Sequence, residues 1–318
     1  MQHRTLDASG LRMHVVEAGE GPLVLLCHGF PESWYSWRHQ LRALADAGYR
    51  AVAPDMRGYG RSARPEPIEA YSQLQLVGDV VGLVSALGES RAVIVGHDWG
   101  APVAWNAALL RPDVFRAVAA LSVPFSAPPP MEPTRLLAQL AGDQFHYVLY
   151  FQEPGVAEAE LEADPRHWLQ GFFHVGSGDV DLASTRLAGL PKTARLSDGF
   201  VWPDRPPTWL RDEDLDFYAG EFERTGFRGG LHWYRNIDRS WRELRAFRTA
   251  RHRVPALFIA GEKDGVVLAN PAAVSDLPKL VPTLRDTLMI PGCGHWTQQE
   301  RPEVVSQKLL EFLGGLED

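Results

Sequence analysis

The feature of this chain that most restricts its fold is a regular alternation of short apolar runs and amphipathic stretches over residues 1–125. The stretches at 37–47 and 74–87 place apolar side chains at helical spacing, and each separates two β-favouring runs. The apolar runs lie at residues 23–27, 50–54, 92–95 and 117–123. Strands that alternate with helices in this way form a parallel sheet covered by helices, so the pattern predicts an α/β fold.

The same pattern returns near the end of the chain. Residues 256–260 and 287–290 resemble strands, and 302–313 form an amphipathic stretch with Pro302 at its start. The region between has a Pro-rich beginning, helical stretches and many aromatic residues, but no convincing buried strand. We therefore predict an α/β core made of residues 1–125 and 246–318, interrupted by a helical lid at 126–245.

Composition excludes several classes of partner. The chain has 318 residues, with 32 Lys and Arg against 40 Asp and Glu, which gives a net charge of −8. No run of basic residues is present, so we expect no nucleic-acid partner. The 11 His are dispersed without paired ligand spacing, so neither a metal nor a cofactor is expected. The 10 Trp and 14 Phe suggest an apolar pocket as well as a core.

The sequence also carries expectations about location. The first residues show no secretory signal, and no apolar run is long enough to span a membrane, so a cytoplasmic protein is predicted. Cys27, within a predicted strand, and Cys293, in a Gly-rich loop, are expected to be free thiols. A monomer and a homodimer are both compatible with the sequence.

The sharpest local signal is the segment Gly96-His97-Asp98-Trp99-Gly100, which joins a β run to a helix expected from Pro102 to Leu110. This is the pattern of a nucleophile elbow, in which small residues flank a tight turn that exposes one side chain above the sheet. Asp98 occupies the position where many such enzymes have Ser. Taken alone, an Asp in this place could equally be a helix N-cap.

Two further residues favour the catalytic interpretation. Asp264 follows the strand predicted at 256–260, and His295 follows the one at 287–290. A catalytic triad of this fold has the order nucleophile, acid, histidine, and open α/β sheets place their sites at the carboxyl ends of strands. Asp98, Asp264 and His295 meet both conditions.

An oxyanion hole is expected from the loop after the first apolar run. The two donors on such a fold are the N–H after the nucleophile and one from this earlier loop, here the backbone N–H groups of Trp99 and Phe30. His28 is interpreted as a structural histidine, and Pro31 is a candidate for a cis bond. The segment 58–62 is interpreted as a turn, because it lacks the ending of a phosphate-binding loop, and Arg57 is expected to pair with Asp55.

An Asp nucleophile restricts the substrate. Attack on an acyl carbon would produce an anhydride with little gain, whereas attack on a saturated carbon produces an ester that an activated water can cleave. The substrate should therefore be an epoxide or an alkyl halide. An epoxide oxygen needs an acid such as a phenol, and the insertion carries Tyr147, Tyr150 and Tyr234, although a core role is the default for any Tyr.

The chain resembles the hydrolase domain of soluble epoxide hydrolases, within the α/β-hydrolase fold family. The resemblance covers nearly the whole chain, and the insertion motifs are its most specific part. The matching segments are HGFPESWYSWRHQ at 28–40, PDMRGYGRS at 54–62, GHDWGAPVAW at 96–105, YVLYFQEPGVAEAELE at 147–162, FRGGLHWYRN at 227–236, GEKD at 261–264 and GCGHWTQQERP at 292–302.

The resemblance implies a cofactor-independent reaction that turns a small apolar epoxide and water into a vicinal diol. It implies Asp98 as nucleophile, His295 as base and Asp264 as the acid that orients it. Tyr147 and Tyr234 would hold the epoxide oxygen, and Tyr150, one turn from Tyr147, is the residue most easily confused with it. The expected substrate pocket comprises Phe30, Pro31, Trp99, Tyr150 and Trp296.

Two alternatives remain open. Haloalkane dehalogenases also place Trp after an Asp nucleophile, but many of them have Asn where this chain has Phe30. Some take the triad acid from the strand before the insertion, and residues 122–126 offer no acid. A non-catalytic ligand receptor on the same scaffold is the second alternative.

Overall fold

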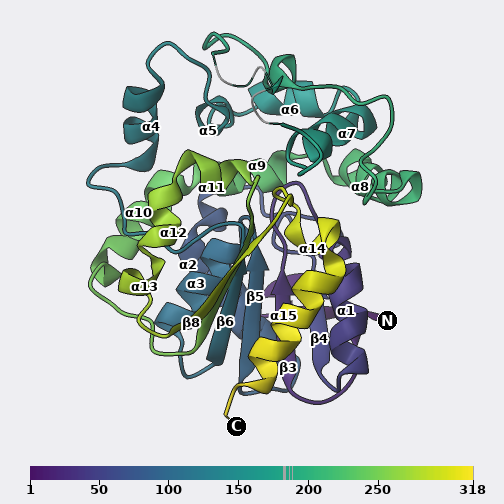
Figure 1. The fold of residues 1–318 in the computed structure, drawn as a ribbon, viewed down its shortest axis with the longest axis vertical. Coiled ribbons are helices and arrows are strands. Elements are labelled where there is room, and N and C mark those ends of the chain that lie inside the picture. The colour runs from purple at the N-terminus through teal and green to yellow at the C-terminus, as the bar shows by residue number, and fades with distance from the viewer. Residues whose placement is uncertain (182–183, 186, 188, 318) are drawn as a thin grey trace.

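An eight-stranded sheet forms the centre of the molecule (Figure 1). The computed structural model describes residues 1–181, 184–185, 187 and 189–317. The strand order is β1-β2-β4-β3-β5-β6-β7-β8. The strands are β1 (Gln2–Ala8), β2 (Leu11–Ala18), β3 (Leu23–Cys27), β4 (Arg50–Pro54), β5 (Ala92–His97), β6 (Phe115–Leu121), β7 (Ala256–Gly261) and β8 (Leu284–Ile290). Along this order, the pairings from β4 to β8 are parallel. β2 pairs antiparallel with both of its neighbours, β1 and β4.

The mostly parallel sheet flanked by helices confirms the predicted α/β core, and each of the six predicted strands is present. The N-terminal hairpin of β1 and β2 was not predicted. Ser9 and Gly10 form its turn with φ angles of 58° and 90°, the left-handed values that suit a two-residue hairpin loop. The Ser-Gly pair before the alternating residues 11–15 was the available sequence signal.

Helices cover both faces of the sheet. On one face lie α1 (Arg38–Asp46) and α15 (Pro302–Gly314), which pack on each other and on one apolar cluster. On the other lie α2 (Gln73–Ala86) and α3 (Gly100–Leu110), which pack on a second cluster. Three shorter helices connect β7 to β8: α11 (Gly265–Ala269), α12 (Pro271–Ser275) and α13 (Leu277–Leu280). Another, α14 (Thr297–Glu300), lies between β8 and α15. The 3-10 turns are η1 (Trp34–Trp37), η2 (Ile68–Tyr71), η4 (Leu196–Gly199) and η5 (Arg245–Phe247).

The chain between β6 and β7 is helical. Its described residues form no strand beyond an isolated bridge between Gln144 and Pro191. Figure 1 shows most of these helices as a layer across one end of the sheet. They are α4 (Pro133–Ala141), α5 (Tyr147–Tyr150), α6 (Val156–Leu161), α7 (Pro165–Val175), α8 (Asp212–Thr225), α9 (Arg228–Arg235) and α10 (Ile237–Leu244).

One predicted ion pair is wrong. Arg57 does not pair with Asp55; its Nε donates to Oδ2 of Asp79 at 2.7 Å. Asp55 instead accepts hydrogen bonds from the backbone N–H groups of Trp34 and Arg61, and its Oδ2 lies 2.7 Å from Nδ1 of His14. Both carboxylates are buried, so each is satisfied by partners that folding brings to it.

Candidate active site

The turn between β5 and α3 holds Asp98 in a strained backbone conformation, with φ at 48°. Two residues before and two residues after Asp98, close backbone contacts leave room only for glycine. A Cβ at Gly96 would lie 2.0 Å from the carbonyl oxygen of Gly100, and a Cβ at Gly100 would lie 2.2 Å from that of Cys27. The elbow pattern in the sequence thus has a steric cause.

The predicted acid and histidine converge on this turn. Asp264 follows β7 and is fully buried, and its Oδ1 also accepts the N–H of Val266 at the start of α11. The Nδ1 atom of His295 lies 3.0 Å and 3.1 Å from the two carboxylate oxygens of Asp264. On the other side of the ring, Nε2 lies 3.5 Å from Oδ2 of Asp98. The imidazole therefore stands between two carboxylates.

This arrangement sets the charges of the three side chains. Burial alone would lower the pKa of His295, but the nearby carboxylates of Asp264 and Asp98 raise it well above its usual value. Burial would likewise raise the pKa of Asp98, yet the hydrogen bond and charge of His295, with a smaller contribution from the Phe30 N–H, keep it below the usual value. Both shifts favour an imidazolium at His295 beside an ionised Asp98.

A buried polar network fixes the backbone of His295. Its carbonyl oxygen lies 2.8 Å from Nε2 of His97 and accepts a hydrogen bond from Oγ of Ser122 at 2.8 Å. The other ring nitrogen of His97 lies 2.8 Å from Oε2 of Glu32. The side-chain amides of Gln298 and Gln299 donate to Oε1 of Glu32.

Sequence reasoning missed this network. Glu32 belongs to the motif HGFPE and His97 to the motif GHDWG. Their positions next to predicted site residues were the sequence signal that could have identified them.

The predicted oxyanion loop touches the nucleophile. The N–H of Phe30 donates to Oδ1 of Asp98 at 2.7 Å, and the Phe30–Pro31 peptide bond is cis. Within the described part of the chain, the N–H of Trp99 makes no hydrogen bond to this carboxylate. His28 has the structural role expected of it, because its ring lies between the carbonyl of Gly29 and the N–H of Met56.

A cavity of about 480 Å³ opens above Asp98 and also exposes His295 and Asp264 to its interior. Its wall is mainly apolar and comes from both the core and the insertion. Tyr147 and Tyr234 both line it, with ring centroids 6.1 Å apart. Burial, followed by the charge of Asp98, raises the pKa of each tyrosine, so both hydroxyls are neutral donors.

The pocket residues expected from the sequence divide into two groups. Phe30 and Trp296 line the cavity, whereas Pro31, Trp99 and Tyr150 are outside its wall, which corrects the expectation for these three. Tyr150 turns away because its hydroxyl donates to Glu160 at 2.6 Å.

The ring of Trp99 packs edge-on against Tyr234, with centroids 5.0 Å apart, and lines a separate apolar hollow. Most of the remaining wall comes from insertion residues that no motif identified. These wall residues include Phe145, His146, Phe172, Val175, Leu196 and Phe200.

Comparison with known proteins agrees with this geometry. A family model described as alpha/beta hydrolase fold matches residues 22–175. Epoxide hydrolase A of Mycobacterium tuberculosis is 48% identical, over 99% of this chain and 98% of its own length. The mouse bifunctional epoxide hydrolase 2 is 41% identical over 96% of this chain, which corresponds to 54% of the longer mouse protein.

Solved structures give the same result. An epoxide hydrolase from an endophytic Streptomyces has a TM-score of 0.95 at 50% identity, covering 99% of this chain and 95% of its own. The crystal structure of epoxide hydrolase A from Mycobacterium thermoresistibile has a TM-score of 0.94 at 47% identity, covering 99% of both chains.

The fold and the elbow define an α/β-hydrolase. Within that class, the chain belongs to the epoxide hydrolase family. Among the described residues, no helix is long and apolar enough to cross a membrane, and no group of three or more His, Cys, Asp or Glu is arranged to hold a metal ion.

Proposed function

We propose that this protein hydrolyses apolar epoxides to vicinal diols through a covalent ester on Asp98. The observation that carries the proposal is the single cavity that brings together the Asp98 carboxylate, the His295 ring and the Tyr147 and Tyr234 hydroxyl-bearing side chains. The relatives named above are epoxide hydrolases, which supports the substrate class. The apolar wall favours a substrate whose only polar part is the oxirane.

In the first step, a carboxylate oxygen of Asp98 attacks an oxirane carbon. Oδ1 accepts the Phe30 N–H, which leaves Oδ2 as the attacking atom. A carbon–oxygen bond of the ring breaks as the ester bond forms. The departing oxygen takes a proton from the hydroxyl of Tyr147 or Tyr234, and the phenolate left behind regains a proton from solvent water.

The second step depends on the loss of the negative charge of Asp98 in the first step. Once Asp98 is an ester, its negative charge no longer supports the imidazolium, so the pKa of His295 falls and the ring is left neutral. Neutral His295, oriented by Asp264, takes a proton from a water that attacks the ester carbon. The charge then developing on Oδ1 faces the Phe30 N–H. As this intermediate collapses, the bond from its central carbon to the ester oxygen breaks. The departing alkoxide takes the proton of the newly added hydroxyl and leaves as the diol, which restores the Asp98 carboxylate beside the His295 imidazolium.

We further propose that residues 126–245 act as a lid on this site. Tyr147 and Tyr234 both come from this segment, whereas Asp98, Asp264 and His295 come from the ends of core strands. Closure of such a lid excludes bulk water from the ester and places the phenols over the nucleophile.

An isotope experiment tests the covalent step. Repeated turnover in ¹⁸O-water labels the carboxylate of Asp98, and a single turnover in ordinary water should then give a diol that carries the label. In the His295→Gln variant the ester should accumulate as a mass increase equal to the epoxide, and Asp98→Ala should show no increase. An unlabelled diol would mean direct attack by water and would overturn the scheme.

The same preparation separates the alternatives. Release of halide from short chloroalkanes at a rate comparable with epoxide opening would favour a dehalogenase. Saturable binding without turnover across styrene-type, aliphatic terminal and fatty-acid epoxides would favour a receptor.

A further inference from the structure

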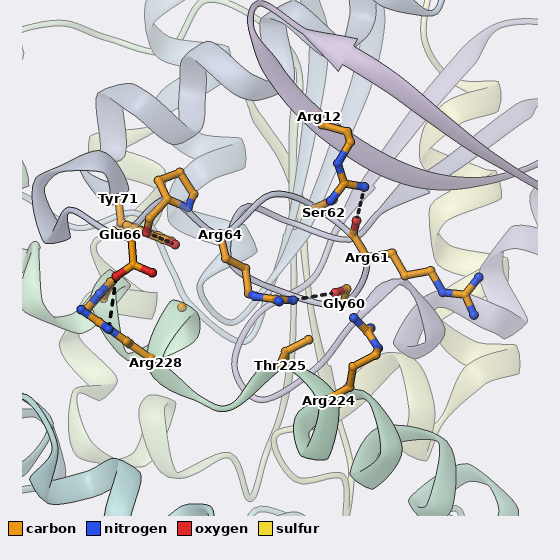
Figure 2. A pocket seen from close by; sticks show the side chains of 13 residues that line it. Arg12, Gly60, Arg61, Ser62, Arg64, Glu66, Tyr71, Arg224, Thr225 and Arg228 are labelled. Carbon is orange, nitrogen blue, oxygen red and sulfur yellow. Dashed lines mark hydrogen bonds and ion pairs between the residues drawn. The ribbon is translucent and has the colours of Figure 1, made fainter.

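A second cavity, of about 470 Å³, lies where the core meets the insertion. Its wall comes from β2, from the turn that follows β4, and from the junction of α8 and α9 (Figure 2). It shares no lining residue with the cavity above Asp98. The residues that line it are Arg12, Gly60, Arg61, Ser62, Arg64, Pro65, Glu66, Tyr71, Arg224, Thr225, Arg228, Gly229 and His232.

The charge of this cavity is unusual for an acidic protein. Five of the lining residues are arginines and only Glu66 is acidic, although the whole chain has a net charge of −8. Glu66 pairs with Arg228 at 3.4 Å, and Arg224 pairs with Glu221 on its own helix. The remaining three guanidinium groups have no carboxylate partner among the described residues.

Two of these three, Arg12 and Arg64, make backbone contacts instead. Arg12 donates to the carbonyl oxygen of Arg61 at 2.9 Å, and Arg64 donates to that of Gly60 at 3.4 Å. Figure 2 shows the side chains of Arg64 and Arg224 extending toward Gly60, while that of Arg61 points to one side. Guanidinium groups from the core and from the insertion thus approach the same space. Their mutual repulsion favours an anion between them.

One residue of the cavity wall, His232, carries a buried donor without a partner among the described residues. His232, on α9, is 1% exposed, and its Nδ1 lies 3.1 Å from a guanidinium nitrogen of Arg235. Because that guanidinium can only donate, Nδ1 is the acceptor and Nε2 carries the hydrogen. Nε2 has no hydrogen-bond partner in the described part of the chain. Buried N–H groups are nearly always satisfied, so an acceptor belongs here.

The neutral form of His232 keeps this donor in place. Burial, and then the charges of Arg235 and Arg228, lower the pKa of His232 to about 4, while Glu158 acts weakly in the other direction. At neutral pH the ring is therefore a directed hydrogen-bond donor and adds no further positive charge.

We propose that this cavity binds a small polyanion that carries a di- or triphosphate group. Guanidinium groups match phosphate oxygens bidentately, and a chain of phosphates presents oxygens in several directions at once. A single carboxylate would satisfy one arginine, whereas the donors here stand on opposite walls. The segment after β4 contributes Arg64, which follows the turn at 58–62, so the cavity does not depend on the ending of a phosphate-binding loop.

Occupancy would join the core to the insertion. Arg64 belongs to the core turn, whereas Arg224, Arg228 and His232 belong to α8 and α9. The same helix α9 carries Tyr234 of the active site. A bound polyphosphate therefore holds in place the helix that presents one of the two phenols.

Calorimetric titration of the whole protein with sodium triphosphate, pyrophosphate and citrate at low salt tests the proposal. We expect triphosphate to bind more tightly than pyrophosphate, and citrate at least tenfold more weakly than triphosphate. The R64Q/R224Q variant should weaken triphosphate binding at least tenfold. The matched control R239Q/R242Q removes the same charge from exposed positions on α10 and should change the Kd less than twofold.

A second variant tests the buried donor. His232→Phe keeps a ring beside Tyr71 but removes the Nε2 hydrogen, and it should weaken triphosphate binding several-fold in protein whose Tm confirms folding. Absence of heat with triphosphate, equal weakening in both arginine pairs, binding of citrate as tight as that of triphosphate, or unchanged binding in folded His232→Phe would each overturn the proposal. The titration needs no epoxide, so its result is independent of the proposed hydrolysis.

Discussion

Asp98 and the residues around it show how the surroundings of a side chain decide its chemistry. Asp98, Asp264 and Asp214 are all acidic, but their partners differ. Both oxygens of Asp264 lie within 3.1 Å of Nδ1 of His295, and Asp214 lies 3.4 Å from the Arg38 guanidinium. Asp98 stands in the elbow turn, where Oδ1 accepts the Phe30 N–H and Oδ2 lies 3.5 Å from Nε2 of His295. The tyrosines show the same principle. Tyr147 and Tyr150 are one helical turn apart, but only Tyr147 faces the nucleophile.

We expect Tyr147→Phe and Tyr234→Phe each to slow ester formation by on the order of 100-fold, because each removes a donor to the developing alkoxide. Stopped-flow fluorescence of a single turnover measures this rate. Tyr150→Phe is the matched control and should stay within about twofold of the parent, since its hydroxyl is bonded to Glu160 outside the cavity. Equal losses in all three variants would contradict the assignment.

His252 supplies a prediction about pH. It is 3% exposed and packs against Trp105 and Phe125, and neither ring nitrogen has a hydrogen-bond partner among the residues that the structure describes. Burial lowers its pKa to about 4, so below about pH 6.5 the unfolded chain takes up a proton that the folded protein does not. The stability contributed by the neutral ring is present above that pH and is lost as the pH falls toward 4.

Between pH 7 and pH 4.5, His252→Phe should therefore lose roughly 2 kcal/mol less unfolding free energy than the parent. Urea denaturation at the two pH values, each compared with the parent at the same pH, measures the difference. A parallel decline in both proteins would show that the folded state protonates this ring freely.

At the scale of elements, the connections after the strands carry the chemistry. β5, β7 and β8 are parallel, so the residues after them reach the same edge of the sheet, and the elbow turns the chain sharply into α3. Helix α9 combines two tasks within eight residues, since Arg228 and His232 line the basic cavity while Tyr234 lines the active site.

The elbow should tolerate no side chain at position 96. Gly96→Ala places a Cβ 2.0 Å from the Gly100 carbonyl oxygen and should reduce the unfolding free energy by about 3 kcal/mol or more. Gly78→Ala, at an exposed position of α2 with no described atom within 4 Å of the new Cβ, should instead stabilise the protein by about 0.5–1 kcal/mol. Chemical denaturation compares them, and similar values for both variants would refute the steric explanation.

At the scale of the whole molecule, the attachment of the insertion to the core matters most. Asp214 at the start of α8 is 1% exposed, accepts a hydrogen bond from the Tyr35 hydroxyl at 2.7 Å and lies 3.4 Å from the Arg38 guanidinium. Burial opposes ionisation, but these partners and Arg211 lower the pKa of Asp214 to about 2. This is a charged contact between the two parts of the fold.

We expect Asp214→Asn to reduce the unfolding free energy by about 3 kcal/mol, because it leaves buried cationic and hydroxyl groups without their acceptor. Asp212→Asn is the matched control on the same helical turn. Its partner Arg166 is exposed, so the loss should stay below about 0.5 kcal/mol. Thermal unfolding at pH 7 measures the two losses of stability. An equal loss in both variants would show that the contact of Asp214 with the core contributes no more than an exposed ion pair.

Much of this protein could be predicted from its sequence. The apolar runs from residue 23 onward, the elbow around Asp98, and the order of Asp98, Asp264 and His295 are local features, and the geometry of parallel sheets converts them into positions. The motifs in the insertion indicated the family and singled out Tyr147 and Tyr234.

Only the tertiary structure decided which side chains meet across the fold. It assigned Arg57 to Asp79, placed Tyr150 on Glu160, and brought Glu32 and His97 behind His295. It also gathered arginines from β2, a core turn and two helices into one basic cavity. Periodicity identifies the face of a single element, whereas contacts between residues far apart in the chain depend on how those elements pack.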